Sequence, residues 1–127
     1  MFQLRIDQMP FLTHLLDARL AKDQSENERI RQQLLQQTLS WLTNNAQRYG
    51  VKSGYIFGSV TVLHRFTQYS DIDVAIETHK SGDICGLMSG LSMLLLRDID
   101  MVPLDQCHFA DKIRRTGLAW TAIELPH

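Results

Sequence analysis

The chain has 127 residues, with 13 Lys or Arg against 14 Asp or Glu, a formal net charge of −1 and 44% hydrophobic residues. This length and composition predict a single globular domain with one core. The near-neutral charge argues against a protein that holds DNA or RNA by bulk charge, because that requires a basic excess.

The cysteines and the apolar runs bear on the cellular compartment. Cys85 and Cys107 allow only one pair and so make no disulfide framework, and we expect both to be small packed residues. The first ten residues lack the apolar stretch of a signal peptide. The longest apolar run, Met93–Leu96, is too short to cross a bilayer. We therefore expect a cytoplasmic protein with no membrane contact.

Residues 1–50 are predicted to form a helical extension packed on the core, built from two amphipathic helices. Apolar residues recur at helical spacing up to Leu20, and again from Ile30 to Tyr49, with Gly50 placed to end the second helix. The polar stretch Lys22–Arg29 lies between the two patterns. Within it, Ser25–Glu28 has the form of a capping box that would begin the second helix. The apolar faces of these helices would also allow pairing with another chain, including a homo-oligomer.

Residues 51–127 show alternating strand and helix patterns. We expect strands at 55–57, 71–77, 98–102 and 118–125, a short helix after the first strand, a helix over 84–95 and a last helix from Asp105 towards Gly117. This order predicts an α/β fold of the α+β type, with a mixed sheet flanked by helices.

Gly58-Ser59 follows the first predicted strand directly. A glycine there allows a sharp turn and a close approach of the backbone to a ligand. Ser59 would cap the following helix, whose free N–H groups suit a phosphate. Ordinary turn chemistry is the simpler interpretation of the pair taken alone.

Acidic residues open two of the predicted strands. Asp71 and Asp73 are two apart, so their carboxylates should project from the same face, where a divalent cation would relieve their repulsion. Asp100 lies within a third apolar strand, where a charge is costly unless it is paired or bound to metal, whereas Asp98 should be solvated. A phosphate-binding turn beside three carboxylates has the parts of a two-metal phosphoryl-transfer site.

Three segments together resemble the minimal nucleotidyltransferase family of the DNA polymerase beta superfamily. They are Phe57-Gly58-Ser59, Ser70-Asp71-Ile72-Asp73-Val74-Ala75-Ile76 and Ile99-Asp100-Met101-Val102, and Ile113–Gly117 is similar to the family's closing segment. The resemblance spans residues 51–123. It implies a polymerase beta-like nucleotidyltransferase core over residues 51–127.

The resemblance also implies an activity and a set of roles. Members transfer a nucleoside monophosphate, here expected to be AMP from ATP, to a hydroxyl with the help of Mg²⁺. Asp71, Asp73 and Asp100 would be the catalytic residues and metal ligands. Gly58, Ser59 and Ser70 would bind the nucleotide phosphates. Many small members are antitoxins that modify a HEPN-type ribonuclease toxin, which makes a partner protein the expected acceptor.

The chain departs from the family pattern after Ser59. The usual Gly-Ser-x-Ala-Arg-Gly is replaced by Gly58-Ser59-Val60-Thr61-Val62-Leu63, so an Arg and a Gly are lost, while His64 and Arg65 follow closely. A catalytically weak or inactive binding module that neutralises or scaffolds a partner is therefore the alternative function. A small-molecule nucleotidyltransferase of the antibiotic-modifying type is a weaker alternative, because the chain has no helical acceptor domain after the core.

Overall fold

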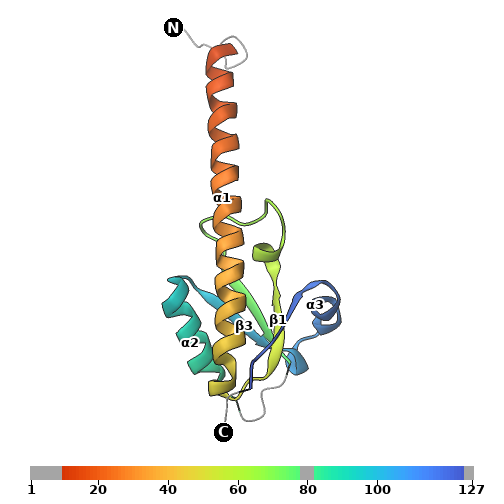
Figure 1. Ribbon diagram of the computed structural model, residues 1–127. Helices are drawn as coiled ribbons and strands as arrows, with labels where there is room; N and C mark the ends of the chain where they lie inside the picture. Colours follow the sequence, from red (N-terminus) through yellow and green to blue (C-terminus); the bar gives the residue numbers. More distant parts are fainter. Residues whose placement is uncertain (1–9, 78–81, 125–127) are drawn as a thin grey trace.

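The computed structural model describes residues 10–77 and 82–124, with the side chains of residues 10–12 excepted, and it has an α+β fold. A mixed four-stranded sheet is flanked by three α-helices (Figure 1). In chain order the elements are α1 (Pro10–Asn45), the 3₁₀ turn η2 (Ala46–Tyr49), β1 (Ser53–Phe57), the 3₁₀ turn η3 (Gly58–Thr61), β2 (Ile72–Ile76), α2 (Ile84–Leu95), β3 (Ile99–Pro103), the 3₁₀ turn η4 (Leu104–Gln106), α3 (Ala110–Thr116) and β4 (Leu118–Thr121).

The prediction of two N-terminal helices is wrong, because α1 is one continuous helix of 36 residues. The polar stretch Lys22–Arg29 contains neither Gly nor Pro and is rich in good helix formers, so nothing in it ends the helix. Its charges support the helix instead, through ion pairs from Arg29 to Glu26 and from Arg31 to Glu28 at i,i+3 spacing. Ser25 caps nothing. Gly50, in the left-handed region at φ 75°, caps η2 directly after the helix.

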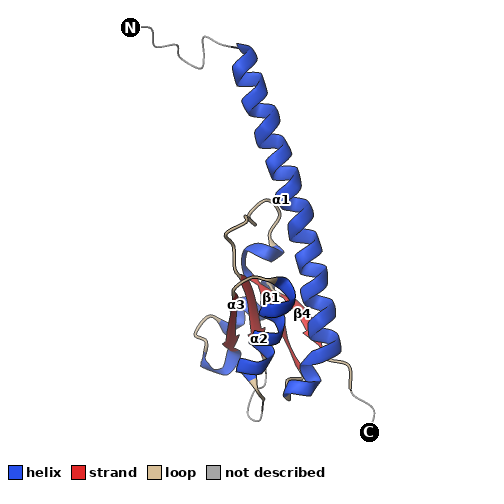
Figure 2. Ribbon diagram, turned by 90° about the vertical axis from the view of Figure 1, so that its left-hand side faces the viewer, coloured by secondary structure: helices blue, strands red, loops and turns tan. Residues whose placement is uncertain are grey.

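The strands lie in the order β3-β2-β1-β4. β1 runs antiparallel to both β2 and β4, whereas β2 and β3 are parallel. The crossover between these parallel strands is α2, which packs on the same face of the sheet as α1 (Figure 2). One end of the sheet therefore carries the carboxyl end of β1 together with the amino ends of β2 and β3.

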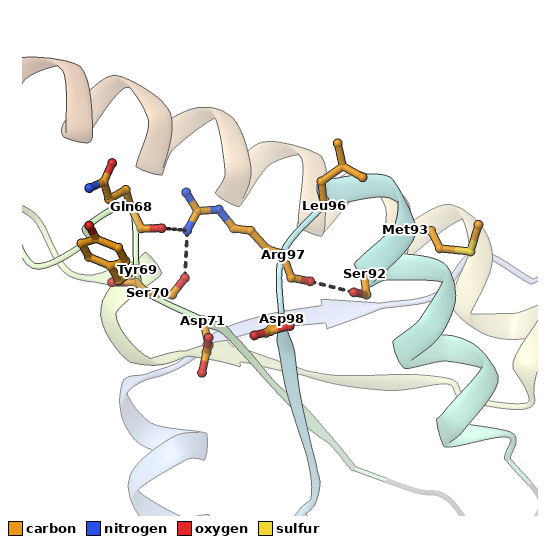
Figure 3. Close-up of a pocket in the computed structure, with 9 residues that line it drawn as sticks. All are labelled: Gln68, Tyr69, Ser70, Asp71, Ser92, Met93, Leu96, Arg97 and Asp98. Carbon is orange, nitrogen blue, oxygen red and sulfur yellow. Dashed lines mark hydrogen bonds between the residues drawn. The ribbon is translucent and has the colours of Figure 1, made fainter.

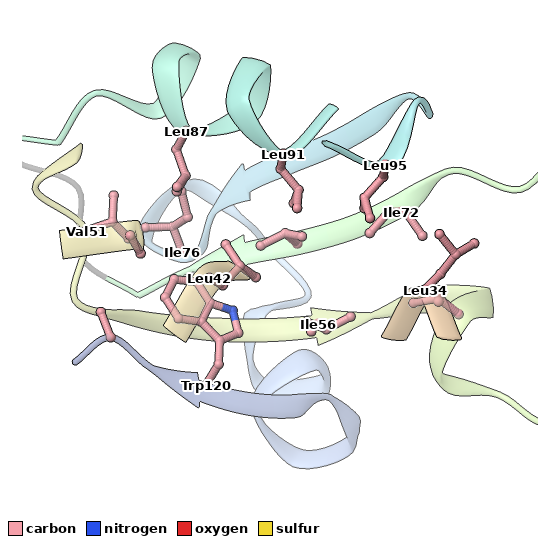
Figure 4. Close-up of a cluster of buried hydrophobic side chains, with 14 of the residues drawn as sticks. Leu34, Leu42, Val51, Ile56, Ile72, Ile76, Leu87, Leu91, Leu95 and Trp120 are labelled. Atoms are coloured by element: carbon pink, nitrogen blue, oxygen red, sulfur yellow. The ribbon is translucent and has the colours of Figure 1, made fainter. Parts of the chain in front are cut away.

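The two faces of the sheet carry separate apolar clusters. The larger one joins the sheet to α1 and α2 and includes Ile56, Ile72, Leu42, Leu91 and Trp120, all buried (Figure 4). The smaller cluster joins the opposite face to α3 through Ala75, Leu104, Ala110 and Ile113. α3 has only seven residues and covers only part of this face of the sheet.

Several boundaries differ from the sequence-based expectation. α3 begins at Ala110 rather than near Asp105, because Asp105 lies in the separate 3₁₀ turn η4. β4 ends at Thr121, four residues before the predicted end at Leu125, which lies outside the described residues. Cys85 is exposed rather than packed, and Cys107 is half-buried. Within the described part of the chain, none of the helices combines the length and the apolar character needed to cross a bilayer.

Candidate functional site

The structure brings the three predicted carboxylates to one face at one end of the sheet. Asp73 on β2 is the register partner of Asp100 on β3, so the two side chains leave neighbouring strands on the same side. Asp71 precedes β2 by one residue and, being two positions before Asp73, points to that side as well. This face is the one that α3 covers only in part. An acidic cluster is therefore exposed beside α3.

Asp73 is the central member of this cluster. Its side chain is half-buried, and burial together with the charges of Asp100 and Asp71 raises its pKa from 3.8 to about 6. Burial disfavours the charged form of the carboxyl most, and the two neighbouring carboxylates disfavour it further. The site therefore favours a proton or a metal ion at Asp73.

Asp100 lies within β3 as expected, but its side chain is exposed, so the expected cost of a charge at this position does not arise. The cause is topological. β3 is an edge strand of the sheet, so one side of Asp100 has no neighbouring strand to cover it. Asp71 is exposed too, and so is Asp98, as expected for the strand entrance.

Gly58 turns the chain directly beside the acidic cluster. Its φ of 78° lies in the left-handed region, and a Cβ at this position would overlap Oδ2 of Asp73. The neighbouring residue Phe57 is the register partner of Asp73 on β1. The glycine thus brings the backbone against the carboxylate.

Ser59 does not act as a helix cap. It is the second residue of η3, a four-residue 3₁₀ turn that has no side-chain cap, and its carbonyl oxygen accepts from Val62 N at 3.1 Å. The expected phosphate site at a helix N-terminus is therefore not formed in that way. Ser59 lines a pocket instead.

This pocket, of about 420 Å³, lies between the η3 turn and α3. Gly58 and Ser59 form one wall, and two cationic residues, Arg65 and Lys112, also line it. Two cationic side chains around a glycine turn suit a phosphate-bearing ligand. The other basic residue that faces the sheet from α3, Arg114, is engaged with Glu77 at 2.7 Å.

A second pocket, of about 630 Å³, lies on the other side of Asp71 (Figure 3). Ser70 and Asp71 line it together with Tyr69, Asp98 and the end of α2. Ser70 is thus on the side away from the Gly58 pocket. Its hydroxyl oxygen accepts from Thr67 N at 3.0 Å.

Arg97 is a residue of the site that sequence reasoning missed. Its Nη1 donates to the carbonyl oxygens of Ser70 at 2.9 Å and Gln68 at 3.3 Å (Figure 3). Its guanidinium lies 4.7 Å from the Phe66 ring centroid. These contacts fix the loop that ends at Asp71. No spacing in the sequence pointed to Arg97, because its partners lie 27 and 29 residues away.

In the described part of the chain, no group of three or more His, Cys, Asp or Glu side chains is placed as a preformed metal site. The chain matches no known family model, no curated protein and no solved structure.

Proposed function

We propose that this chain is a magnesium-dependent nucleotidyltransferase with a polymerase beta-like core, which transfers AMP from ATP to a hydroxyl on a partner protein. The observation that carries the proposal is the registration of Asp73 with Asp100, with Asp71 on the same face and the Gly58 turn against Asp73. The resemblance to the minimal nucleotidyltransferases suggests a HEPN-type toxin as the acceptor.

The donor set fits Mg²⁺. Magnesium prefers carboxylate oxygens and is commonly held by one or two carboxylates together with waters and substrate phosphates, so a complete protein cage is not required. The pKa of Asp73 is raised by burial and by the charges of Asp100 and Asp71, and a bound cation would relieve this cost of ionisation. When bound, the metal would neutralise triphosphate charge and lower the pKa of the attacking hydroxyl.

The chain's own residues divide the remaining tasks. Asp71 and Asp73 would hold the metal, while Asp100, exposed on the edge strand, is accessible to an acceptor and would take up the proton of its hydroxyl. Arg65 and Lys112 would bind the phosphates in the pocket beside Gly58. Arg65 lies three positions after Val62, which occupies the place of the family's Arg, and it offers a cation from the same loop.

Transfer of label from α-labelled ATP to a candidate partner in the presence of Mg²⁺ tests the proposal. Asp73→Asn and Asp100→Asn should each lower the rate by about 100-fold or more, the scale for loss of one transition-state charge contact. Arg65→Ala should raise the KM for ATP about tenfold, the value of one charge-assisted hydrogen bond. Arg48→Ala, a change at an exposed residue on η2 away from the pocket, is the matched control.

Wild-type protein that binds its partner but neither binds ATP with Mg²⁺ nor transfers label would overturn the proposal. The second candidate would then hold, a binding module without turnover. The exposed Val62 and Leu63 favour it, because these apolar side chains replace the Arg and Gly of the family pattern, and Val62 lines the pocket. A binding module predicts that Asp73→Asn leaves neutralisation of the partner intact, whereas an enzyme predicts its loss.

A further inference from the structure

The amino-terminal half of α1 projects beyond the sheet and the other helices (Figures 1 and 2). From His14 to Glu26 every side chain is exposed, and the first contacts with the body are made around Glu28, which accepts from His64 N, and Arg31, which donates to Val60 O. We call residues 10–27 the overhang. At 1.5 Å per residue it is about 27 Å long.

The overhang carries large apolar side chains that no other described residue buries. Leu15, Leu16 and Leu20 are 58%, 42% and 60% exposed. A free helix of this length draws little stability from its own hydrogen bonds and usually depends on packing of an apolar face. A helix that keeps three exposed leucines where packing is needed indicates an interface.

The apolar face of the overhang continues the face that α1 buries lower down. Leu16 lies 18 residues, or five helical turns, before the buried Leu34, and Leu20 lies 18 residues before the buried Thr38. Leu16 and Leu20 therefore look towards the same side as the sheet. They face the space above the body.

We propose that a second copy of this chain covers the overhang, with the two overhangs packed antiparallel about a two-fold axis. A parallel copy is excluded by shape, because the body and the apolar face lie on the same side of α1 and the two bodies would occupy the same space. An antiparallel copy places the bodies at opposite ends and sets Leu16 of one chain against Leu20 of the other. The arrangement is closed and self-complementary. It does not depend on the proposed catalysis.

The charges along α1 favour this occupant. The first turn of α1 contains no acidic residue to complement the positive end of its helix dipole. With Leu16 opposite Leu20, position 23 of one copy faces position 13 of the other, and position 26 faces position 10. Asp23 and Glu26 of each copy therefore lie beside the helix start of its mate, where their charges complement the helix dipole.

The area sets the strength of the interface. Two helices of about 10 Å width that overlap over 27 Å cover about 300 Å² each, below the roughly 1,200 Å² total of stable complexes. In this pairing the first turn of each helix lies about one turn above Glu28 of the other copy. It therefore adds contact with the part of that copy near Leu63. We therefore expect a concentration-dependent dimer with a Kd of about 1–100 μM.

Sedimentation equilibrium over a concentration series tests the proposal. Wild-type protein should shift from the chain mass of 14.6 kDa to twice that value across the micromolar range. Leu16→Glu with Leu20→Glu should stay monomeric, with helix content from circular dichroism reporting that the fold is kept. Met93→Glu, an equally drastic change at a 77% exposed residue on α2, should dimerise as the wild type does.

Cysteine cross-linking tests the orientation in a chain with Cys85→Ser and Cys107→Ser. A mixture of Leu16→Cys and Leu20→Cys chains should cross-link, whereas each variant alone should not, because positions 16 and 16 are offset along the axis. Cross-linking of each variant alone would indicate a parallel pair and overturn the arrangement. A wild-type monomer at millimolar concentration would overturn the second copy as the occupant, even if the double Glu variant lost binding to another protein.

Discussion

Removing the charge of Asp73 should stabilise the protein at neutral pH. The carboxyl has a pKa of about 6 in the folded chain against an ordinary value of 3.8, because burial, Asp100 and Asp71 all disfavour its ionised form. The folded state therefore holds this proton more tightly than the unfolded state does. Between these two pKa values the free energy of unfolding must fall as the pH rises, and the loss is complete above the higher value.

The magnitude follows from the difference between the two pKa values. It corresponds to about 3 kcal/mol for a fully desolvated group, and solvent screening of this half-exposed side chain lowers it to about 1–2 kcal/mol. Asp73→Asn should therefore match the wild type near pH 3.5 and exceed its stability by about 1–2 kcal/mol above pH 6.5. A site residue whose replacement stabilises the fold is typical of a residue that is retained for function at a cost in stability.

Urea unfolding of both proteins from pH 3.5 to 8 measures this difference. Asp98→Asn is the matched control, because Asp98 is an exposed carboxylate at the entrance of β3, and its effect should stay within about 0.5 kcal/mol. Added Mg²⁺ at ten times its Kd should stabilise the wild type by about 1.4 kcal/mol at pH 7.5 and the Asn variant much less. The reasoning fails if Asp73→Asn is destabilising at pH 7.5, or if its effect is the same at every pH.

Two further predictions concern the backbone around the acidic cluster. Gly58→Ala should destabilise the fold by about 1 kcal/mol or more, because alanine is strained at positive φ and its Cβ would displace the Asp73 carboxylate. Urea unfolding measures this loss of stability. Weaker Mn²⁺ binding should accompany it. Arg97→Gln should weaken Mn²⁺ binding measured by electron paramagnetic resonance, because it removes the guanidinium that holds the Ser70 and Gln68 carbonyls before Asp71. Arg115→Gln, on the exposed surface of α3, should leave Mn²⁺ binding unchanged.

The local features of the core could be predicted from the sequence because they depend on short-range patterns. Alternation of apolar and acidic residues in Asp71-Ile72-Asp73 places both carboxylates on the face opposite the buried Ile72, and the structure has this arrangement. The order of strands and helices after Gly50 follows from the same periodicities. Patterns of this range do not reveal which strand lies at an edge, so the exposure of Asp100 was missed.

The contacts that the sequence did not predict depend on partners far away in the sequence. No pattern in the sequence assigned a role to Arg31, yet this residue is 8% exposed and joins Glu28 on its own helix to the Val60 carbonyl, 29 residues away. Arg65 reaches the pocket of Gly58 only because the loop after η3 folds back beside α3. Such long-range pairings are set by the tertiary structure, and neither composition nor periodicity encodes them.

The acidic cluster is finally a consequence of how the core fixes strand register. Every second residue of β2 and β3 is apolar and faces α1 and α2. These residues are Ile72 and Val74 on β2 and Ile99 and Met101 on β3. A shift of one residue between them would bury Asp100 among these side chains, which the cost of an unpaired buried charge forbids. The backbone bond from Ile72 N to Asp98 O, 3.1 Å, pins the same register at the strand entrance. The packing that stabilises the fold therefore also holds Asp73 and Asp100 side by side, although their repulsion opposes it.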